Sequence, residues 1–118
     1  MNTEYVALPD HSTVADAMSA LKENEELLES LNTIFLIDAN EQLTGAVPLA
    51  RLFIASGSTP LKDLAHETLI QASVGEKQDH IIELFDKYSL LSLPVVDDDG
   101  KLSGAITADD IISVLRQR

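Results

Sequence analysis

Residues 35–47 read FLIDANEQLTGAV, and residues 94–106, which start 59 positions later, read PVVDDDGKLSGAI. Asp, Leu, Gly and Ala recur at the same places in both stretches, and apolar residues face apolar residues almost throughout. A period of this size indicates a duplicated supersecondary unit, and a unit this small cannot bury its apolar face alone. We therefore expect the two copies to pack on each other and to leave a cleft where they meet.

The composition is that of one ordinary globular domain. The 118 residues are 45% hydrophobic, with three Phe, two Tyr and no Trp, so Leu, Ile, Val and Ala must build the core. No stretch reaches the roughly 20 uncharged apolar residues of a membrane span, so no direct membrane insertion of this chain is expected. The absence of Cys excludes disulfides, thiol nucleophiles and thiolate metal sites, and it favours the cytosol.

The net charge excludes one class of partner. Twenty acidic residues against eight basic ones give a formal charge of -12 at pH 7, which repels a phosphate backbone, so no nucleic-acid partner is expected. Two interpretations of this charge stay open. It can serve solubility alone, or clustered carboxylates can recruit hard divalent cations, which prefer oxygen ligands.

Local patterns predict the elements of the first copy. Thr13 and Asp16 have capping-box spacing at the start of a helix from Val14 to Glu23, and Pro48 suits the first position of a short helix. The other predicted elements are a strand at residues 5–8, a helical turn at 25–32, and two strands at 34–37 and 43–47 that a hairpin joins. The short helix is expected to carry three apolar residues on one face: Leu49, Leu52 and Phe53.

The second copy repeats this order, with Asp99-Gly100 as a strong hairpin signal. Its predicted elements begin with a helical turn at residues 61–64, a strand at 69–72 and a helix at 81–88. Two strands at 93–97 and 102–106 follow, and the last helix runs from 107 onward. Four residues of the last helix are expected to point inward: Ile111, Ile112, Val114 and Leu115. Each copy is thus strand, helix, strand, strand, helix, and the fold class is α+β. Residues 1–118 form a single module, with repeat 1 at about 5–55, a linker at 56–60 and repeat 2 at about 61–118.

Two further stretches carry a family resemblance. Residues 104–110 read GAITADD and are preceded by LPVVD at 93–97, which resembles the end of a CBS motif, the repeat named after cystathionine beta-synthase. Two tandem copies resemble a CBS pair, or Bateman module, over about Tyr5 to Leu115. The long first copy and the run LNTIFLID at residues 31–38 are most similar to the cytosolic part of MgtE-type magnesium transporters.

The resemblance implies a regulatory role and no enzymatic activity. CBS pairs pack their repeats with pseudo-two-fold symmetry, bind an adenine nucleotide such as ATP or AMP in the clefts between them, and often form homodimers. In MgtE-type proteins the module resembles a magnesium sensor that gates an attached membrane domain. The expected partners are therefore a second copy and a transporter membrane domain, and the expected location is the cytosolic part of an inner-membrane protein, as an excised piece or a free-standing relative. The alternative is a dimerising interaction module without a small-molecule ligand.

Thr107 and Asp110 are the candidate ribose and phosphate contacts that the resemblance implies. A helix N-terminus offers free N–H groups to a phosphate, and a carboxylate accepts from ribose hydroxyls. The same pair is also a legitimate capping box that needs no ligand, and both interpretations stay open. The first copy has Pro48 and Arg51 at these places, so one cleft lacks the signature. Arg51 either pairs with a phosphate in the other cleft or is a solvated surface arginine.

The adenine pocket is the second part of the predicted site. Five residues correspond to segments that line this pocket in the family: Leu69, Ile70, Ser92, Leu93 and Pro94. Their apolar character is also what filling the core requires, so the pattern alone does not separate the two roles.

No metal ligand follows from sequence spacing. Residues 97–100 read DDDG but lack the ligand spacing of a calcium loop, so a solvated hairpin turn is predicted there. Magnesium needs only one or two carboxylates, and a diffuse site is conceivable at Asp97 to Asp99 or among the acidic residues Glu23, Glu25, Glu26 and Glu29. The three histidines, His11, His66 and His80, have no spacing that suggests zinc binding or acid–base catalysis.

Overall fold

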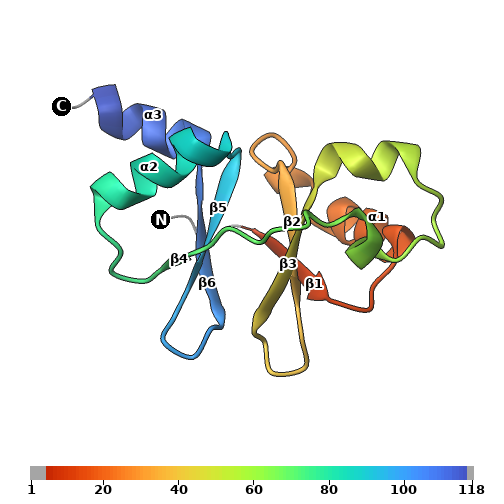
Figure 1. Ribbon diagram of the computed structural model, residues 1–118. Coiled ribbons are helices and arrows are strands. Elements are labelled where there is room, and N and C mark those ends of the chain that lie inside the picture. Colours follow the sequence, from red (N-terminus) through yellow and green to blue (C-terminus); the bar gives the residue numbers. More distant parts are fainter. Residues whose placement is uncertain (1–4, 117–118) are drawn as a thin grey trace.

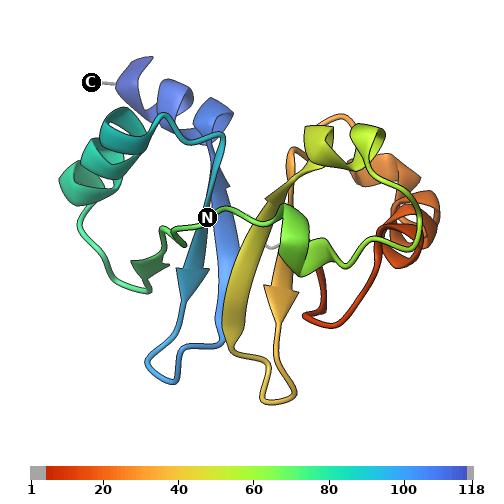
Figure 2. The ribbon, with the colours of Figure 1, turned by 45° about the vertical axis from the view of Figure 1, so that its right-hand side comes forward.

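Two three-stranded sheets face each other at the centre of the molecule, and helices cover the outer side of each sheet (Figure 1). The computed structural model describes residues 5–116. Each sheet with its helices comes from one copy of the repeat, which confirms the predicted α+β class. Figure 2 shows the two sheets meeting along the middle of the molecule. Among the described residues, no helix is long and apolar enough to span a bilayer.

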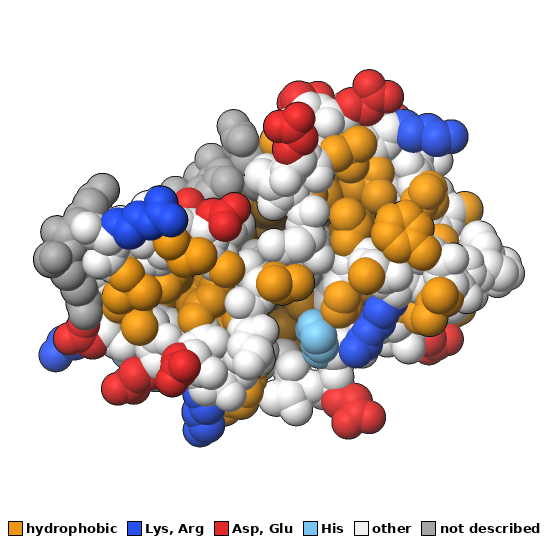
Figure 3. Space-filling model, turned by 90° about the horizontal axis from the view of Figure 1, so that it is seen from above, with side chains coloured by type: hydrophobic (Ala, Val, Ile, Leu, Met, Phe, Trp, Pro, Cys, Tyr) orange, Lys and Arg blue, Asp and Glu red, His pale blue; other side chains and the backbone are white. Residues whose placement is uncertain are grey.

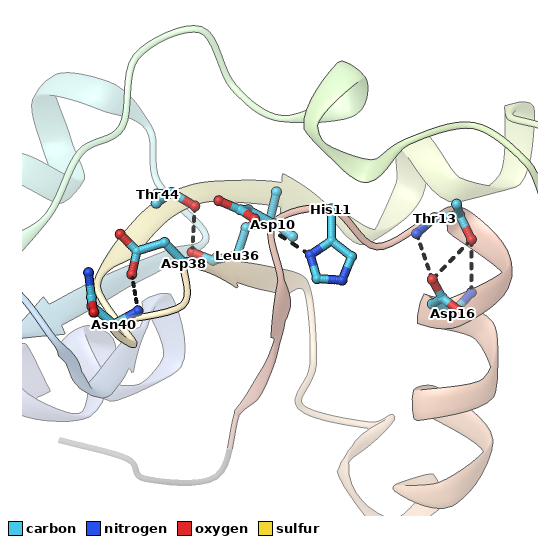
Figure 4. A network of polar contacts seen from close by, with 8 residues as sticks. All are labelled: Asp10, His11, Thr13, Asp16, Leu36, Asp38, Asn40 and Thr44. Carbon is cyan, nitrogen blue, oxygen red and sulfur yellow. Dashed lines mark hydrogen bonds and ion pairs between the residues drawn. The ribbon is translucent and has the colours of Figure 1, made fainter.

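The first copy follows the predicted order. It consists of β1 (Val6–Pro9), α1 (Val14–Glu23), the 3-10 helix η1 (Glu25–Leu27), β2 (Thr33–Ile37), β3 (Leu43–Pro48) and the 3-10 helix η2 (Leu49–Ile54). Strand β1 pairs in parallel with β2, and β2 pairs antiparallel with β3. The predicted capping box of α1 is confirmed: the N–H of Thr13 donates to Asp16 Oδ2 at 2.9 Å, and the N–H of Asp16 donates to Thr13 Oγ1 at 3.4 Å (Figure 4).

The second copy has the same topology. It consists of the 3-10 helix η3 (Leu61–Leu64), β4 (Ala72–Ser73), α2 (Gln78–Tyr88), β5 (Ser92–Val96), β6 (Leu102–Thr107) and α3 (Ala108–Arg116). Strand β4 is parallel to β5, and β5 is antiparallel to β6. The strand predicted over residues 69–72 is wrong except at its end, because only Ala72 and Ser73 pair with β5. Residues 69–71 have no strand pairing and are free to line a cleft instead.

The duplication extends to irregular details of the backbone. The register of each hairpin shifts at the same place, between Leu36 and Ile37 in one copy and between Val95 and Val96 in the other. Both hairpin turns are built on an Asp. Asp38 Oδ1 accepts from the N–H of Asn40 (Figure 4) and from that of Gln42. Asp97 Oδ1 likewise accepts from the N–H groups of Asp99 and Lys101. The solvated hairpin turn predicted at residues 97–100 is therefore confirmed.

The two copies meet through equivalent residues, as a two-fold axis requires. The side chain of Asn32 donates to the carbonyl of Leu91, which lies 59 positions later, and Gln42 forms an isolated bridge with Lys101, again its counterpart. A hydrophobic cluster fills the junction, built from the buried residues Phe35, Ala46 and Ala105 and the partly buried Tyr5, Ala7, Leu43, Leu69 and Leu102. Since residues thus contact their own counterparts, the copies pack with the expected pseudo-two-fold symmetry.

The connecting segment packs on the first copy. Leu61 is fully buried in the hydrophobic core of the first repeat, and its N–H donates to the carbonyl of Ser12 at 2.9 Å. The N–H of Val14 donates to the carbonyl of Thr59 at 2.9 Å. The start of the second repeat is thereby fixed to the first.

Three side chains that were expected to face inward are exposed. Phe53 is 80% exposed because η2 is a 3-10 helix with three residues per turn, which places Leu52 on the inner side with Leu49 and turns Phe53 outward. On α3, Ile111 is buried, but Ile112 and Leu115 are 46% and 45% exposed. The side chain of Val114 lies outside the described residues. Pro48 ends β3 instead of opening the short helix, so its predicted place is off by one residue.

Candidate ligand-binding site

The larger of two clefts lies where the repeats meet, with a cavity volume of about 410 Å³. Its walls come from β3 and the start of β2, from the segment after η3, and from the end of α2 with β5. They comprise Thr33, Ala46, Pro48, His66, Glu67, Thr68, Leu69, Ile70, Tyr88, Ser89, Leu90, Leu91, Ser92 and Pro94. Volumes of roughly 300–1,000 Å³ are usual for small-molecule sites, so the cleft has room for a ligand of nucleoside size.

Two backbone features and one side-chain hydrogen bond hold the walls in place. The N–H of His66 donates to the carbonyl of Ala46 at 3.0 Å, which fixes residues 66–70 against β3. Helix α2 ends at Ser89, whose φ of 51° is left-handed, and this turns the chain back along the cleft. Asn32 donates to the Leu91 carbonyl at 3.3 Å from the opposite repeat. Both repeats therefore shape the cleft, and a ligand in it would touch both.

The cleft combines apolar surface with hydroxyl groups. Leu69, Ile70 and Pro94 offer the flat apolar contacts that suit an aromatic base. The hydroxyls of Thr68, Ser89 and Ser92 also line the cleft and can donate or accept hydrogen bonds at the edge of a base or at a sugar. Thr33 Oγ1 donates to Asn32 Oδ1 at 2.9 Å and can accept a hydrogen bond from a ligand.

The smaller cleft is the counterpart of the larger one under the pseudo-two-fold axis. Its cavity volume within the described residues is about 20 Å³, close to the space of a single water. Its walls include Tyr5 and Asn32 of the first copy and Thr107 of the second, while Thr33 and its counterpart Ser92 border both clefts.

The structure divides the predicted site residues between the two clefts. Leu69, Ile70, Ser92 and Pro94 come together in the larger cleft, whereas Thr107 lines the smaller one. The division has a physical reason: in a two-fold pair, the start of the last helix of one copy faces the adenine segments of the other copy. Pro48, the counterpart of Thr107, therefore lies in the larger cleft with the second copy's apolar segments.

Leu93 and Asp110 line neither cleft. Leu93 is fully buried in the core of the second repeat. The carboxylate of Asp110 accepts the N–H of Thr107 at 3.0 Å, and the N–H of Asp110 donates to Thr107 Oγ1 at 3.3 Å. This capping box repeats that of α1, which confirms the capping interpretation, and the ribose and phosphate role stays a prediction.

Arg51 is exposed but not free. Its guanidinium Nη1 donates to the carbonyl of Leu64 at 2.8 Å and to that of Ala65 at 3.4 Å. It therefore ties η2 to the segment after η3, a role that the sequence did not suggest.

The acidic residues form no evident metal centre. Within residues 5–116, no group of three or more His, Asp or Glu side chains is arranged to hold an ion. Asp97, one candidate from the sequence, uses its carboxylate to cap its own hairpin.

Sequence reasoning predicted four of the described wall residues, Leu69, Ile70, Ser92 and Pro94, and missed most of the others. His66, Glu67 and Thr68 belong to no motif, and Thr33 carries no signal within its own copy. The 59-residue offset could have found Thr33, because it is the counterpart of Ser92, and a two-fold pair brings such counterparts together.

Comparison with known proteins agrees with this geometry. The CBS domain family model matches residues 61–117. The magnesium transporter MgtE of Bacillus subtilis is 34% identical over 115 residues, which are 98% of this chain and 26% of that protein. The chain spans about a quarter of the length of the curated relatives it matches first.

Two solved structures share the fold over almost the whole chain. The soluble part of a magnesium transporter has a TM-score of 0.89 at 31% identity, covering 98% of this chain and 45% of that one. The cytosolic domain of the Mg2+ channel MgtE in complex with ATP has a TM-score of 0.87 at 28% identity, covering 94% and 45%. Residues 61–117 match the CBS domain family model and the first repeat is their structural duplicate, so the chain is a tandem pair of CBS-type repeats that resembles the cytosolic CBS region of MgtE-type magnesium transporters.

Proposed function

We propose that this chain is a regulatory module that binds an adenine nucleotide in the larger cleft, pairs with a second copy and controls an attached magnesium transporter domain. The observation that carries the proposal is the cleft itself, which is apolar at its centre, bordered by hydroxyls and shared by both repeats. Further support comes from the similar MgtE domain, which was solved in complex with ATP.

In the proposed mechanism, ligand binding shifts the equilibrium between different arrangements of the repeats and subunits. A ligand that touches Thr33 on one repeat and Ser92 on the other favours the arrangement in which these walls lie at the right distance. Magnesium would also favour one arrangement if it neutralised carboxylates that two subunits bring together. The chain carries a net charge of -12, so two copies repel each other when no cation lies between them. Both ligands would then influence the transporter domain to which the module is attached.

The homodimer in this proposal has candidate surfaces on both repeats. Phe53 and Ile54 on η2 are 80% and 87% exposed, and Ile112, the counterpart of Phe53, is exposed on α3. Figure 3 shows hydrophobic side chains gathered over both halves of one face, with a hollow between them. Exposed apolar surface of this kind is typical of an interaction site.

A matched pair of variants tests the cleft. Ile70→Ala removes apolar contact beneath the base and is expected to weaken AMP binding about tenfold in calorimetric titration. Ile82→Ala removes the same atoms from the core of the second repeat, outside the cleft, and should leave the affinity unchanged. Equal affinities in the two variants would contradict the proposed site.

A second candidate function is a dimerising interaction module without a small-molecule ligand. It is favoured by Pro48, which replaces the hydroxyl expected at that place in the larger cleft. This alternative predicts a dimer in sedimentation experiments and no heat with either AMP or ATP.

A further inference from the structure

We propose that the larger cleft selects its ligand by charge, taking an adenine ligand with few or no phosphates in preference to free ATP, and that Glu67 sets this preference. The inference rests on the proposed function, since it concerns which adenine ligand enters the same cleft. It is carried by the side chains of the walls.

Among the described residues, the walls contain one carboxylate and one imidazole, that of His66, but no Lys or Arg. Glu67 contributes the carboxylate. Proteins hold phosphate groups chiefly through Arg, Lys and free N–H groups, so a triphosphate has little to bind here. The overall charge of -12 adds to the repulsion.

The first copy lacks the Thr and Asp pair that would be the predicted phosphate and ribose contact at this cleft. Pro48 stands where the second copy has Thr107, and it has neither a hydroxyl nor a backbone N–H to donate. Arg51 follows three residues later, but its guanidinium is bonded to the carbonyls of Leu64 and Ala65. Both bonds come from Nη1 and hold the side chain against the segment after η3, and Arg51 is not among the residues that line the cleft.

The same carboxylate suits an unphosphorylated sugar. Ribose hydroxyls donate hydrogen bonds, and a carboxylate only accepts them, as in dinucleotide sites where Asp or Glu holds the 2′-hydroxyl. Glu67 can therefore accept from a nucleoside while it repels the phosphates of a nucleotide. Thr68, Ser89 and Ser92 can hydrogen-bond either ligand and do not discriminate by charge.

The test is calorimetric titration of the whole chain with adenosine, AMP and ATP in EDTA at low salt. Affinity is expected to fall with each added charge, with adenosine binding at least about fivefold more tightly than ATP. In Glu67→Gln, the ATP affinity should rise about fivefold while the adenosine affinity does not rise. The control is Glu83→Gln, which removes the same charge from an exposed position of α2 outside the cleft.

Three outcomes are distinguishable. Adenosine tighter than ATP, together with a larger gain for ATP in Glu67→Gln than in Glu83→Gln, supports the inference. ATP binding as tightly as adenosine, or equal effects of the two substitutions, overturns it while the adenine site stands. If none of the three ligands binds, the proposed function fails and the inference fails with it.

Discussion

At the scale of single residues, Thr107 and Asp110 form a helix cap, and a ligand-binding role for the same pair stays a prediction. Their mutual hydrogen bonds satisfy N–H groups at the start of α3, as those of Thr13 and Asp16 do for α1. The effect of removing the α1 cap is therefore a reference for the effect of removing a cap alone. If Thr107 and Asp110 also bind a ligand, their substitution must have an effect in addition to the loss of the cap.

Asp110→Ala separates the two roles. A cap alone predicts that the variant loses about 1 kcal/mol of unfolding free energy, as Asp16→Ala should, with nucleotide affinity unchanged. A ribose and phosphate role would instead require a nucleotide in the smaller cleft, beside Thr107, and the heat of nucleotide binding would then be lost in Asp110→Ala and retained in Asp16→Ala. Unchanged affinity in both variants would contradict the ligand role and leave the cap.

At the scale of elements, the two hairpin turns have the same left-handed backbone conformation at equivalent positions but place different residues there. Glu41 and Gly100 are counterparts, and both have positive φ, 65° and 80°. Glycine adopts this conformation without strain, whereas other L-residues lose roughly 1–2 kcal/mol there. The first hairpin therefore carries strain that the second avoids.

Gly100→Ala should lower the free energy of unfolding by about 1 kcal/mol, measured by urea denaturation. The added Cβ would lie 3.6 Å from the side chain of Gln42, an ordinary contact, so the effect isolates backbone strain. Gly57→Ala is the control, because Gly57 is not left-handed and its Cβ would also meet only an ordinary contact at 3.6 Å. An equal loss in both variants would refute this explanation.

Elements with strong local signals were predictable from the sequence. The bounds of α1 follow from its capping box and apolar spacing, and the hairpins follow from their turn residues. The face of a short helix was not predictable, because apolar spacing does not distinguish a 3-10 helix from an α-helix, and Phe53 was misplaced. A smaller part of the site was predictable: Leu69, Ile70, Ser92 and Pro94 were found, but the residues that face them across the cleft depend on how the copies pack.

At the scale of the whole molecule, the two repeats are expected to unfold together. The segment that opens the second repeat is buried in the core of the first, with Leu61 fully enclosed. Counterparts such as Asn32 and Leu91 bond across the junction. Neither copy keeps its packing if the other is lost.

Leu61→Ala is therefore expected to lower the free energy of unfolding by about 2–5 kcal/mol, while a single transition remains. Fluorescence of Tyr5 in a Tyr88→Phe background and of Tyr88 in a Tyr5→Phe background reports the two repeats separately. Leu28→Ala, at a partly exposed position, should have a small effect. Separate transitions for the two tyrosines would contradict the shared core.

The most direct measurement is a crystal structure of the chain with AMP bound. The account predicts that the base lies in the larger cleft, between Ile70 and Pro94, with the ribose directed toward the hydroxyls of both repeats. AMP bound away from this cleft, for example beside Thr107 in the smaller cleft, or a larger cleft left empty at saturating AMP, would contradict it.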